Sequence, residues 1–519
     1  MTTVLSVSVR CTHSAIPCPG RPSTLIPFAE QPDRPSYASQ DAGTSVAVTY
    51  MPALAVVDEI GSSHPYLMSR TRKLGALGPA VRPEQRHTCS GDELEIEAYA
   101  LREALLNQAE VRTRLSTHDA VIVGARCAGS VLATRLARVG WDILLVDQAT
   151  FPSDTVSTHF VFPNTLGRLE RLGVMERLTA AHDVPRLLFS WNVLGETVAG
   201  PFTPIAGYER MSCIRRVVLD HALVETAVEA GATTRFGVGV SDLITERDGS
   251  VAGVILQGGE RARARWVFGA DGRNSTVARR LGLTKRDPLR GEMSMLFAYW
   301  TGLPESEWFR LEVWEDRAIT SSPCEDDNHL LVVAGGPELV RGDRHARQAR
   351  YLEWLRKFPD VIGSRALDGG RQVSDLVVAP EGMMRGFFRQ ANGVGWALLG
   401  DAGHYKHPST AQGISDAIEQ ADHVADGLLG EDPNLEGYEQ WRDTRAEEHY
   451  VWSFRSASWP VPEKHLPIHA GLAMDETAGQ EFRDMFTRLH QPSDVYTSER
   501  VVRWAADHAV DRPSRPGSP

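Results

Sequence analysis

The segment from Asp119 to Asp147 constrains the fold more than any other part of the sequence. A short apolar run, "DAVIV", leads into the glycine turn "GARCAG", and a helical stretch of small and aliphatic residues separates it from a second apolar run, "DILLVD". Two such runs joined by a helix predict a β-α-β unit with parallel strands and a right-handed crossover. The sequence therefore predicts an α/β fold with a nucleotide-binding turn at the tip of the first strand.

Arg126 stands where the G-x-G-x-x-G pattern of such a turn has its second glycine. Gly124 permits the tight bend, and Gly129 lets the helix pack closely. The arginine is costly only if its backbone needs a positive φ, and its guanidinium suits phosphate oxygens. Asp147, at the end of the second strand, can accept hydrogen bonds from ribose hydroxyls. Alone, the motif also fits a tight strand–helix turn without a ligand.

Two later segments repeat the arrangement of a strand that delivers glycine and aspartate. The first is "WVFGADGRNSTVARRLG" (Trp266–Gly282), and the second is "GWALLGDAGHYKHPSTAQGISDAIEQADHVADGL" (Gly395–Leu428). Each places an aspartate, Asp271 or Asp401, at a strand end, where ligands bind in open α/β sheets. Each aspartate could instead cap a turn or a helix.

The order and spacing of the three segments resemble the para-hydroxybenzoate-hydroxylase-like flavoproteins, which include class A flavoprotein monooxygenases, geranylgeranyl reductases and flavin-dependent halogenases. The resemblance spans residues 119 to about 450 and implies FAD as the cofactor. It implies a mixed α/β fold in which a Rossmann-like FAD-binding domain is interleaved with an antiparallel-sheet substrate domain. The corresponding FAD-binding segments are 116–185, 211–288 and 376–430, the substrate-domain segments are 186–210 and 289–375, and a helical C-terminal region with a tail covers 431–519.

The resemblance also assigns cofactor-binding residues. They are Gly124, Arg126, Ala128, Gly129, Asp147, Arg216, Asp271, Gly272, Gly400, Asp401, Pro408, Gly413 and Ile414. Within this set, Asp147 would bind the adenosine ribose, Asp401 the ribityl chain, and the backbone of Gly413 and Ile414 the flavin pyrimidine edge. Arg216 could instead form an ion pair with Glu209 or Asp220 on the surface.

No catalytic residue follows from the sequence, but three histidines are candidates. His159 lies where the chain of the resembled family passes near the flavin, and "GHYKHP" puts His404 and His407, with Tyr405 and Lys406 between them, beside the predicted cofactor. A histidine in such a position can act as a general acid or base. A structural role for His159, and a solvent-facing or backbone-bonded role for the others, are the alternatives.

One nucleotide-binding β-α-β fingerprint is visible, so NAD(P)H is expected as a transient co-substrate rather than as a second resident nucleotide. The resemblance then implies a monooxygenase that uses NAD(P)H and O2 on a hydrophobic or aromatic small molecule, as in secondary metabolism. The substrate is expected between the FAD domain and the strand-rich layer that contains Trp191, Phe297, Trp300 and Trp314. An FAD-dependent reductase of an isoprenoid-like C=C bond and a non-catalytic FAD-binding paralogue are alternatives. Halogenation is disfavoured because the halogenases' Trp-x-Trp-x-Ile-Pro stretch is absent.

Composition limits the partners, metals and cellular location that we expect for this protein. The net charge of −12 argues against a nucleic-acid partner. No apolar run approaches the roughly 20 residues of a membrane span. The six cysteines form no C-x-x-C pair and no Cys/His metal spacing, so we expect reduced thiols, no metal and a cytoplasmic protein. Residues 1–115 are expected to be an extension, mostly disordered, with one helix near 92–115.

Overall fold

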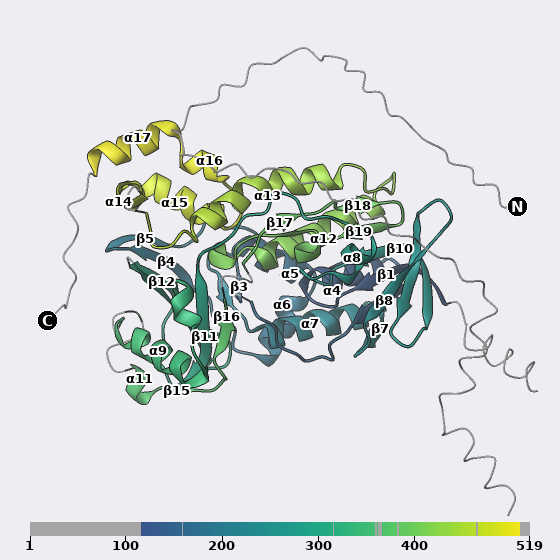
Figure 1. The fold of residues 1–519 in the computed structure, drawn as a ribbon, viewed down its shortest axis with the longest axis horizontal. Coiled ribbons are helices and arrows are strands. Elements are labelled where there is room, and N and C mark those ends of the chain that lie inside the picture. The colour runs from purple at the N-terminus through teal and green to yellow at the C-terminus, as the bar shows by residue number, and fades with distance from the viewer. Residues whose placement is uncertain are drawn as a thin grey trace, which may run out of the picture. The chain divides into compact units, whose positions relative to one another are not determined.

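The structure, a computed structural model, describes residues 116–508 except residues 158, 315, 359–360, 362–365, 381–383 and 463–464. The extension 1–115, with the helix expected near 92–115, and the last part of the predicted C-terminal tail lie outside the described residues. Two sheets organise the described part of the chain, with helices grouped around each of them (Figure 1).

The first sheet contains the predicted β-α-β unit. Its main order is β18–β19–β10–β1–β2–β7, and β1 is paired in parallel with both β10 and β2. Its strands are β1 (Ser116–Val123), β2 (Ile143–Asp147), β7 (Thr233–Phe236), β8 (Val240–Thr245), β9 (Val251–Leu256), β10 (Arg261–Gly269), β18 (Asn392–Gly393) and β19 (Trp396–Leu398). Every residue of β2 is buried, as expected for a parallel strand covered on both faces.

Helices α4 (Cys127–Ala137), α7 (Arg216–Glu229) and α12 (Gly413–Leu429) pack together beside this sheet (Figure 1). The strands β8, β9 and β10 form an antiparallel meander. Its turns have positive φ angles at Gly249, Gly258 and Gly259, which glycine adopts without strain. The remaining elements near the first sheet are α5 (Pro163–Arg171), α6 (Val174–Ala181), α8 (Thr276–Arg280), β3 (Phe160–Val161), β6 (Ser212–Cys213), β17 (Phe387–Phe388) and β20 (His404–Tyr405).

The second sheet has the order β15–β11–β14–β13–β12–β4–β5, with β16 also on β11. Its strands are β4 (Leu188–Val193), β5 (Glu196–Gly200), β11 (Ser294–Thr301), β12 (Trp308–Trp314), β13 (Arg317–Pro323), β14 (His329–Gly335), β15 (Arg371–Gln372) and β16 (Val377–Ala379). Neighbouring strands are antiparallel except β4 and β12, which are parallel. The strand β13 was not predicted, and β16 joins this sheet although it begins two residues after the expected boundary at 375.

The two faces of β11 have different neighbours because side chains alternate along a strand. Phe297 and Tyr299 belong to an aromatic core with the C-terminal helices. Trp300 belongs to a separate core with α9 (Arg344–Arg356), and Trp314 packs against that same core. All four aromatics expected in the strand-rich layer lie on strands of the second sheet, but Trp300 and Trp314 pack on its outer face, against the core that contains α9.

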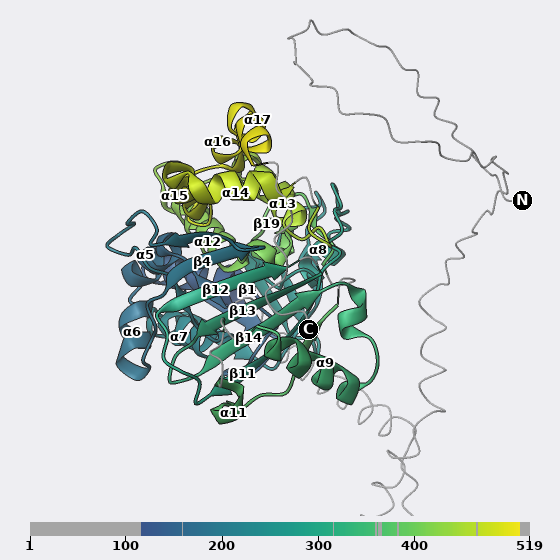
Figure 2. The ribbon, with the colours of Figure 1, turned by 90° about the vertical axis from the view of Figure 1, so that its left-hand side faces the viewer.

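The C-terminal region is helical, as predicted. It comprises α13 (Tyr438–Arg455), α14 (Leu466–Met474), α15 (Glu476–Met485), α16 (Pro492–Val495) and α17 (Ser498–Asp507). In both ribbon views α14 and α15 lie beside the β4–β5 end of the second sheet (Figure 2), and they contact β5. Phe482 and Phe486 pack there against Phe189 and Trp191, so these helices cover one face of the second sheet.

Candidate cofactor site

The three predicted motifs meet at one edge of the first sheet. Their strands β1, β10 and β19 are neighbours and run parallel, so their carboxyl ends lie side by side. The amide of Ala270 donates to Val123 O at 2.7 Å, and the amide of Leu399 donates to Gly269 O at 2.9 Å. The loops that carry Gly124, Asp271 and Asp401 therefore start from adjacent points.

Glycines let these loops approach each other more closely than other residues could. Gly124 has φ +104°, and a Cβ there would lie 2.3 Å from Ala270 O. A Cβ on Gly129 would lie 1.7 Å from Gly124 O. A Cβ on Gly400, with φ +57°, would lie 3.3 Å from Ala417 Cβ in the same motif and 3.7 Å, an ordinary contact distance, from Ala128 Cβ. The backbones of the first two motifs thus meet tightly, and the third motif contacts the first at Ala128.

Arg126 fits this cradle without backbone strain. It is the N-cap of α4 with φ −96° and ψ −158°, so the position does not need the positive φ that glycine supplies. Its guanidinium donates to Asp220 Oδ2 at 2.5 Å and to Ser153 Oγ at 3.2 Å. The arginine therefore joins the turn to α7 and to the loop after β2, and its phosphate contact stays a prediction.

Arg216 shares the same carboxylate. Its Nε donates to Asp220 Oδ1 at 3.0 Å, and its Nη2 lies 2.9 Å from that atom. The ion pair with Asp220 that the sequence left open is present, but it is buried rather than on the surface. The charge of Arg216 also acts on Asp401, which places the arginine near the third motif as well as the first.

Asp147 and Asp271 hold backbone amides at the strand tips. Asp147 Oδ2 accepts from Ala125 N at 2.7 Å, and its Oδ1 accepts from Ala149 N at 2.8 Å. Asp271 Oδ2 accepts from Thr276 N at 2.6 Å at the start of α8. Asp271 therefore has the capping role that the sequence left open, and Asp147 holds the glycine turn through Ala125. Asp271 Oδ1 is buried without a hydrogen-bond partner in the described part of the chain, so that oxygen has capacity for a ligand.

Asp401 and the start of α12 form the other end of the site. Asp401 is half-buried in the 3-10 turn η3 (Gly400–Ala402). Burial raises its pKa to about 6, although the charge of Arg216 acts in the opposite direction. Gly413 is exposed at the first position of α12, and no atom lies within 4 Å of the position of a Cβ there. The free amides of this first turn can therefore bind an anionic or carbonyl group.

The other residues predicted at this end lie on the same segment. Pro408 is half-buried in the 3-10 turn η4 (Pro408–Thr410), and Ile414 is buried in the first turn of α12. Gly272, which follows Asp271, has φ +74° and open space at its Cβ position. Gly272 therefore leaves its backbone accessible, while Pro408 and Ile414 shape the turn and the first helical turn beside it.

The three candidate histidines have different environments. His407 Nδ1 accepts from Ser409 N at 3.1 Å as the cap of η4, and burial lowers its pKa to about 3. His404 stacks on Phe388 at 5.5 Å, and burial lowers its pKa as well. His159 Nε2 lies 2.6 Å from the hydroxyl of Tyr299 on β11. His159 is therefore the candidate that joins the segment after β2 to the second sheet.

Sequence reasoning missed the partners of these residues. Tyr299 and Arg488 had no motif to mark them, and Asp220 was considered as a partner of Arg216 but not of Arg126. The missed contacts each span 72 to 140 residues of chain. Lys406 was visible beside His404 and His407, but its partner Asp416 was not singled out. The available signal for Asp416 was an aspartate in the first turn of an amphipathic helix, although its burial is known only from the structure.

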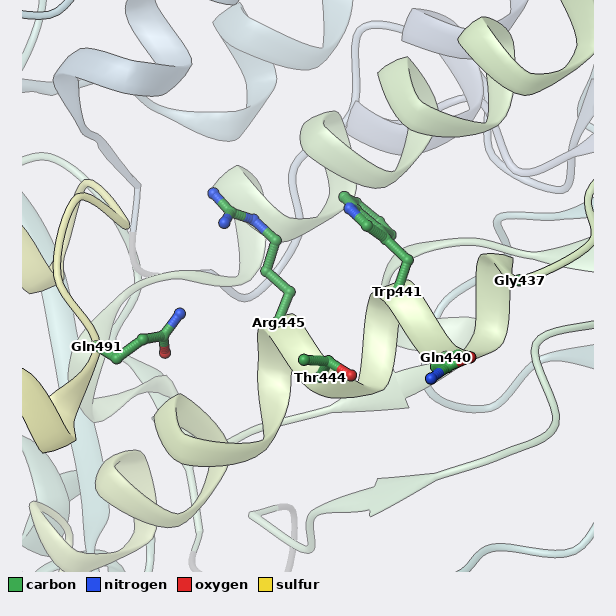
Figure 3. A pocket seen from close by; sticks show the side chains of 6 residues that line it. All are labelled: Gly437, Gln440, Trp441, Thr444, Arg445 and Gln491. Carbon is green, nitrogen blue, oxygen red and sulfur yellow. The ribbon is translucent and has the colours of Figure 1, made fainter.

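A separate hollow lies on the surface of α13 (Figure 3). Its volume is about 440 Å³, and it is lined by Gly437, Gln440, Trp441, Thr444, Arg445 and Gln491. Trp441 stacks on His423 of α12 at 3.7 Å, and Arg445 Nε donates to Glu419 at 2.7 Å. The hollow contains none of the three strand-tip motifs, so it is not the cofactor cradle.

Residues 116–508, apart from the gaps named above, contain neither a membrane-spanning helix nor a metal-binding group of side chains. No helix there has both the length and the apolar character that crossing a membrane requires. No group of His, Cys, Asp or Glu side chains in the same residues is arranged to hold a metal ion.

Comparison with known proteins agrees with this geometry. The family model described as FAD binding domain matches residues 117–448. The chain is 26% identical to the menaquinone reductase of Mycolicibacterium smegmatis over 346 residues, which cover 65% of this chain and 82% of that protein. It is 27% identical over 327 residues to the 3-demethoxyubiquinol 3-hydroxylase of Escherichia coli, covering 60% of this chain and 79% of that protein. The crystal structure of p-nitrophenol 4-monooxygenase from Pseudomonas putida shares the fold, with a TM-score of 0.59 and 18% identity over 73% of this chain and all of that one.

Proposed function

This chain belongs to the FAD-binding domain family and is an FAD-dependent oxidoreductase; from that premise we propose that it is a monooxygenase that uses NAD(P)H and O2 to oxygenate a hydrophobic or aromatic small molecule. The observation that carries the proposal is the convergence of three strand tips on one glycine-lined cradle. A Cβ at Gly124 or Gly129 would overlap backbone oxygens of the protein, so these glycines permit the tight turn that places the first amides of α4 where a pyrophosphate can bind.

The residues of the cradle have complementary tasks toward the cofactor. FAD, when bound, supplies the redox chemistry, and the protein supplies binding, orientation and electrostatics. We assign the pyrophosphate to the turn at Gly124 and the amides that open α4, and the ribose to Asp147. Asp401 would accept hydrogen bonds from the ribityl chain, and the first turn of α12 would donate amides to the pyrimidine edge.

The second sheet offers a pair of residues for handling a proton. His159 has φ +66°, a conformation that a residue other than glycine holds only when its surroundings enforce it, and such strain clusters at functional sites. Burial, followed by the charge of Asp154, raises the pKa of Tyr299, so its hydroxyl stays protonated at neutral pH. We assign to this pair the role of holding a substrate hydroxyl and exchanging its proton, because it joins the two predicted domains.

The proton role has a direct test. Tyr299→Phe and His159→Asn should lower the rate of product formation by roughly a hundredfold, the lower range for loss of a general acid or base. The rate of flavin reduction by NAD(P)H should change little, because that step does not use the pair. Tyr351→Phe is a matched control, since Tyr351 is also buried but lies on the outer face of the second sheet. Equal effects of all three substitutions would contradict the assignment.

A second function is supported by one specific finding. The chain resembles a protein named menaquinone reductase over most of that protein's length. This similarity favours the alternative of an FAD-dependent reductase of an isoprenoid-like C=C bond, which would consume an electron donor without O2.

One experiment separates the candidates. Full-length protein is purified, its visible spectrum is recorded, and it is titrated anaerobically with NADH and NADPH. It is then given labelled dioxygen and a panel of phenols, quinols and prenylated quinones. A labelled product with matching O2 consumption supports the monooxygenase, and alkene loss under argon supports the reductase. Bound flavin that NAD(P)H does not reduce would refute the monooxygenase.

A further inference from the structure

A buried group of charged side chains lies behind the first turns of α12, outside the residues assigned to FAD. Asp416 Oδ2 lies 2.5 Å from Lys406 Nζ, and Asp416 Oδ1 lies 2.5 Å from Arg488 Nη2. All three residues are 7% exposed or less. Two cations thus share one carboxylate, and the group carries one positive charge in excess.

Among the residues that the structure describes, the polar neighbours of this group do not neutralise its excess positive charge. His404 Nε2 lies 3.4 Å from Asp416 Oδ2, and Gln420 lies 3.2 Å from the other ring nitrogen of His404. Burial lowers the pKa of His404 and, together with Arg488 and Lys406, that of His449. Both histidines are therefore neutral at pH 7 and add no charge of either sign.

The nearest carboxylate on the next turn of α12 is already engaged. Glu419 pairs with Arg445 at 2.7 Å and with Arg168 at 3.3 Å. Lys406 instead approaches Gln412 Oε1 at 3.4 Å, an uncharged acceptor at the N-cap of α12. The excess charge therefore lies next to the amino end of the helix, which is itself positive because of its dipole.

This placement is unfavourable unless an anion compensates for it. Burying an unmatched charge is strongly unfavourable, because the charge loses its hydration without gaining a partner. Burial and the neighbouring Arg488 lower the pKa of Lys406 to about 8, which reflects that cost. The charge is also within electrostatic reach of Asp401, the residue assigned to the ribityl chain. An anionic group at the exposed start of α12 would relieve both the helix dipole and the cluster.

We propose that Lys406 and Arg488, by sharing Asp416, hold one unmatched positive charge behind the start of α12, and that this charge stabilises the anionic reduced flavin relative to oxidised FAD. The inference rests on the proposed placement of the pyrimidine edge at Gly413 and Ile414. Transfer of a hydride from NAD(P)H to FAD gives NAD(P)⁺ and a reduced ring with one negative charge, so atoms and electrons balance. Lys406 and Arg488 are positioning residues here, since they act through the field at the helix and touch neither substrate nor reacting atoms.

The test compares the affinities of the holoenzyme for reduced and oxidised FAD. These follow from the midpoint potential of bound flavin, measured anaerobically with dithionite and redox dyes, and from the dissociation constant of oxidised FAD. Lys406→Met removes the charge and leaves Asp416 paired with Arg488, so the core stays neutral. We expect the ratio of reduced to oxidised affinity to fall about tenfold, or about 30 mV for a two-electron couple. Lys406→Arg should restore it.

Two further variants separate charge from packing. Asp416→Asn raises the positive excess and should shift the ratio in the opposite direction. Arg135 on α4 pairs with Asp422 and Asp426, which lie toward the carboxyl end of α12. Arg135→Met removes this cation and should leave the ratio of reduced to oxidised affinity unchanged. An unchanged ratio in Lys406→Met with FAD retained, or equal shifts in Lys406→Met and Arg135→Met, would overturn the proposal. Because the measurement uses no substrate and no O2, its failure is distinct from absence of monooxygenase activity.

Discussion

Replacement of Gly129 by alanine should weaken both the fold and the cofactor cradle. A Cβ at this position would lie 1.7 Å from Gly124 O, whereas real Cβ atoms essentially never approach a heavy atom within 3.0 Å. The glycine turn would therefore have to move by about 1.3 Å. That movement would pull Ala125 N away from Asp147 Oδ2, where they now form a 2.7 Å hydrogen bond.

The expected loss of stability follows from three terms. Overpacking typically costs about 1–3 kcal/mol, and a buried carboxylate that loses its donor costs about 1–3 kcal/mol. Replacing glycine by alanine within a helix stabilises the folded state by about 1 kcal/mol, because alanine has the higher helix propensity. We therefore expect the Gly129→Ala variant to be less stable by about 1–5 kcal/mol, with about 3 kcal/mol as the central value, and to bind FAD at least tenfold more weakly. Gly129→Val should be worse, because its branched side chain adds further overlap.

The assay is urea unfolding of the FAD-free protein, together with the dissociation constant of FAD measured by quenching of its fluorescence. Gly369→Ala is the matched control, since Gly369 lies in the helix α11 (Ala366–Gly369) and nothing lies within 4 Å of its Cβ position. Gly413→Ala should not lower the urea midpoint, because its Cβ also meets no atom within 4 Å, while it tests the approach of the flavin at α12. A Gly129→Ala variant with the urea midpoint and FAD affinity of the unmodified protein would refute the close contact.

Three further changes test separate parts of the structure. Asp401→Ala should raise the dissociation constant of FAD at least tenfold, measured by flavin absorbance per protein, and full flavin retention would contradict the ribityl role. Burial lowers the pKa of His407 to about 3 in the folded protein, whereas a histidine in the unfolded chain has a pKa of roughly 6.5. Between these two values the unfolded state binds more protons than the folded state. The folded state therefore loses stability as the pH falls through this range. Protonation of His407 in the unfolded state should lower the free energy of unfolding by about 2 kcal/mol at pH 5. The His407→Asn variant should therefore show a smaller difference between its urea midpoints at pH 7 and pH 5 than the unmodified protein. The same difference in both proteins would refute a buried, neutral His407 ring. Trp300→Phe should cost about 1 kcal/mol, because the indole donates to Tyr351 at 3.0 Å, and should leave the substrate KM unchanged; a changed KM would place the outer face in the substrate site.

The glycine-bearing strand tips could be predicted because their signals are local. A buried parallel strand is a short continuous apolar run, and the glycine that follows it marks a turn that no larger side chain can make. Gly124 and Gly400 show this directly, since both have positive φ and close backbone or side-chain neighbours. The order of the three tips in one sheet then followed from the resemblance, and the pairing of β1 with β10 and of β10 with β19 agrees with it.

Features that depend on long-range contacts could not be predicted. The strand β13 reads "RAITSSP", and its polar residues gave no clear alternation, although its neighbours β12 and β14 supply the hydrogen bonds that make it a strand. The two faces of β11 were indistinguishable from sequence, because both carry aromatic residues. Trp300 was expected in the strand-rich layer, where it lies, but only the packing of α9 shows that it occupies the outer face of that layer.

The same limit applies to the electrostatics, and it explains Arg126. An arginine in a glycine turn is unexpected when the turn is considered alone, because the sequence does not show Asp220, which lies 94 residues away. In the structure Arg126 and Arg216 share the fully buried carboxylate of Asp220, just as Lys406 and Arg488 share Asp416 at the other end of the cradle. Each arrangement leaves one cation in excess beside the amino end of a helix. Since FAD carries its negative charge on the pyrophosphate and, when reduced, on the pyrimidine edge, the two excess charges lie next to the two helix starts assigned to those groups. Arg126 is thus consistent with a nucleotide site because it extends the positive potential of the turn without occupying the space that Gly124 and Gly129 keep open.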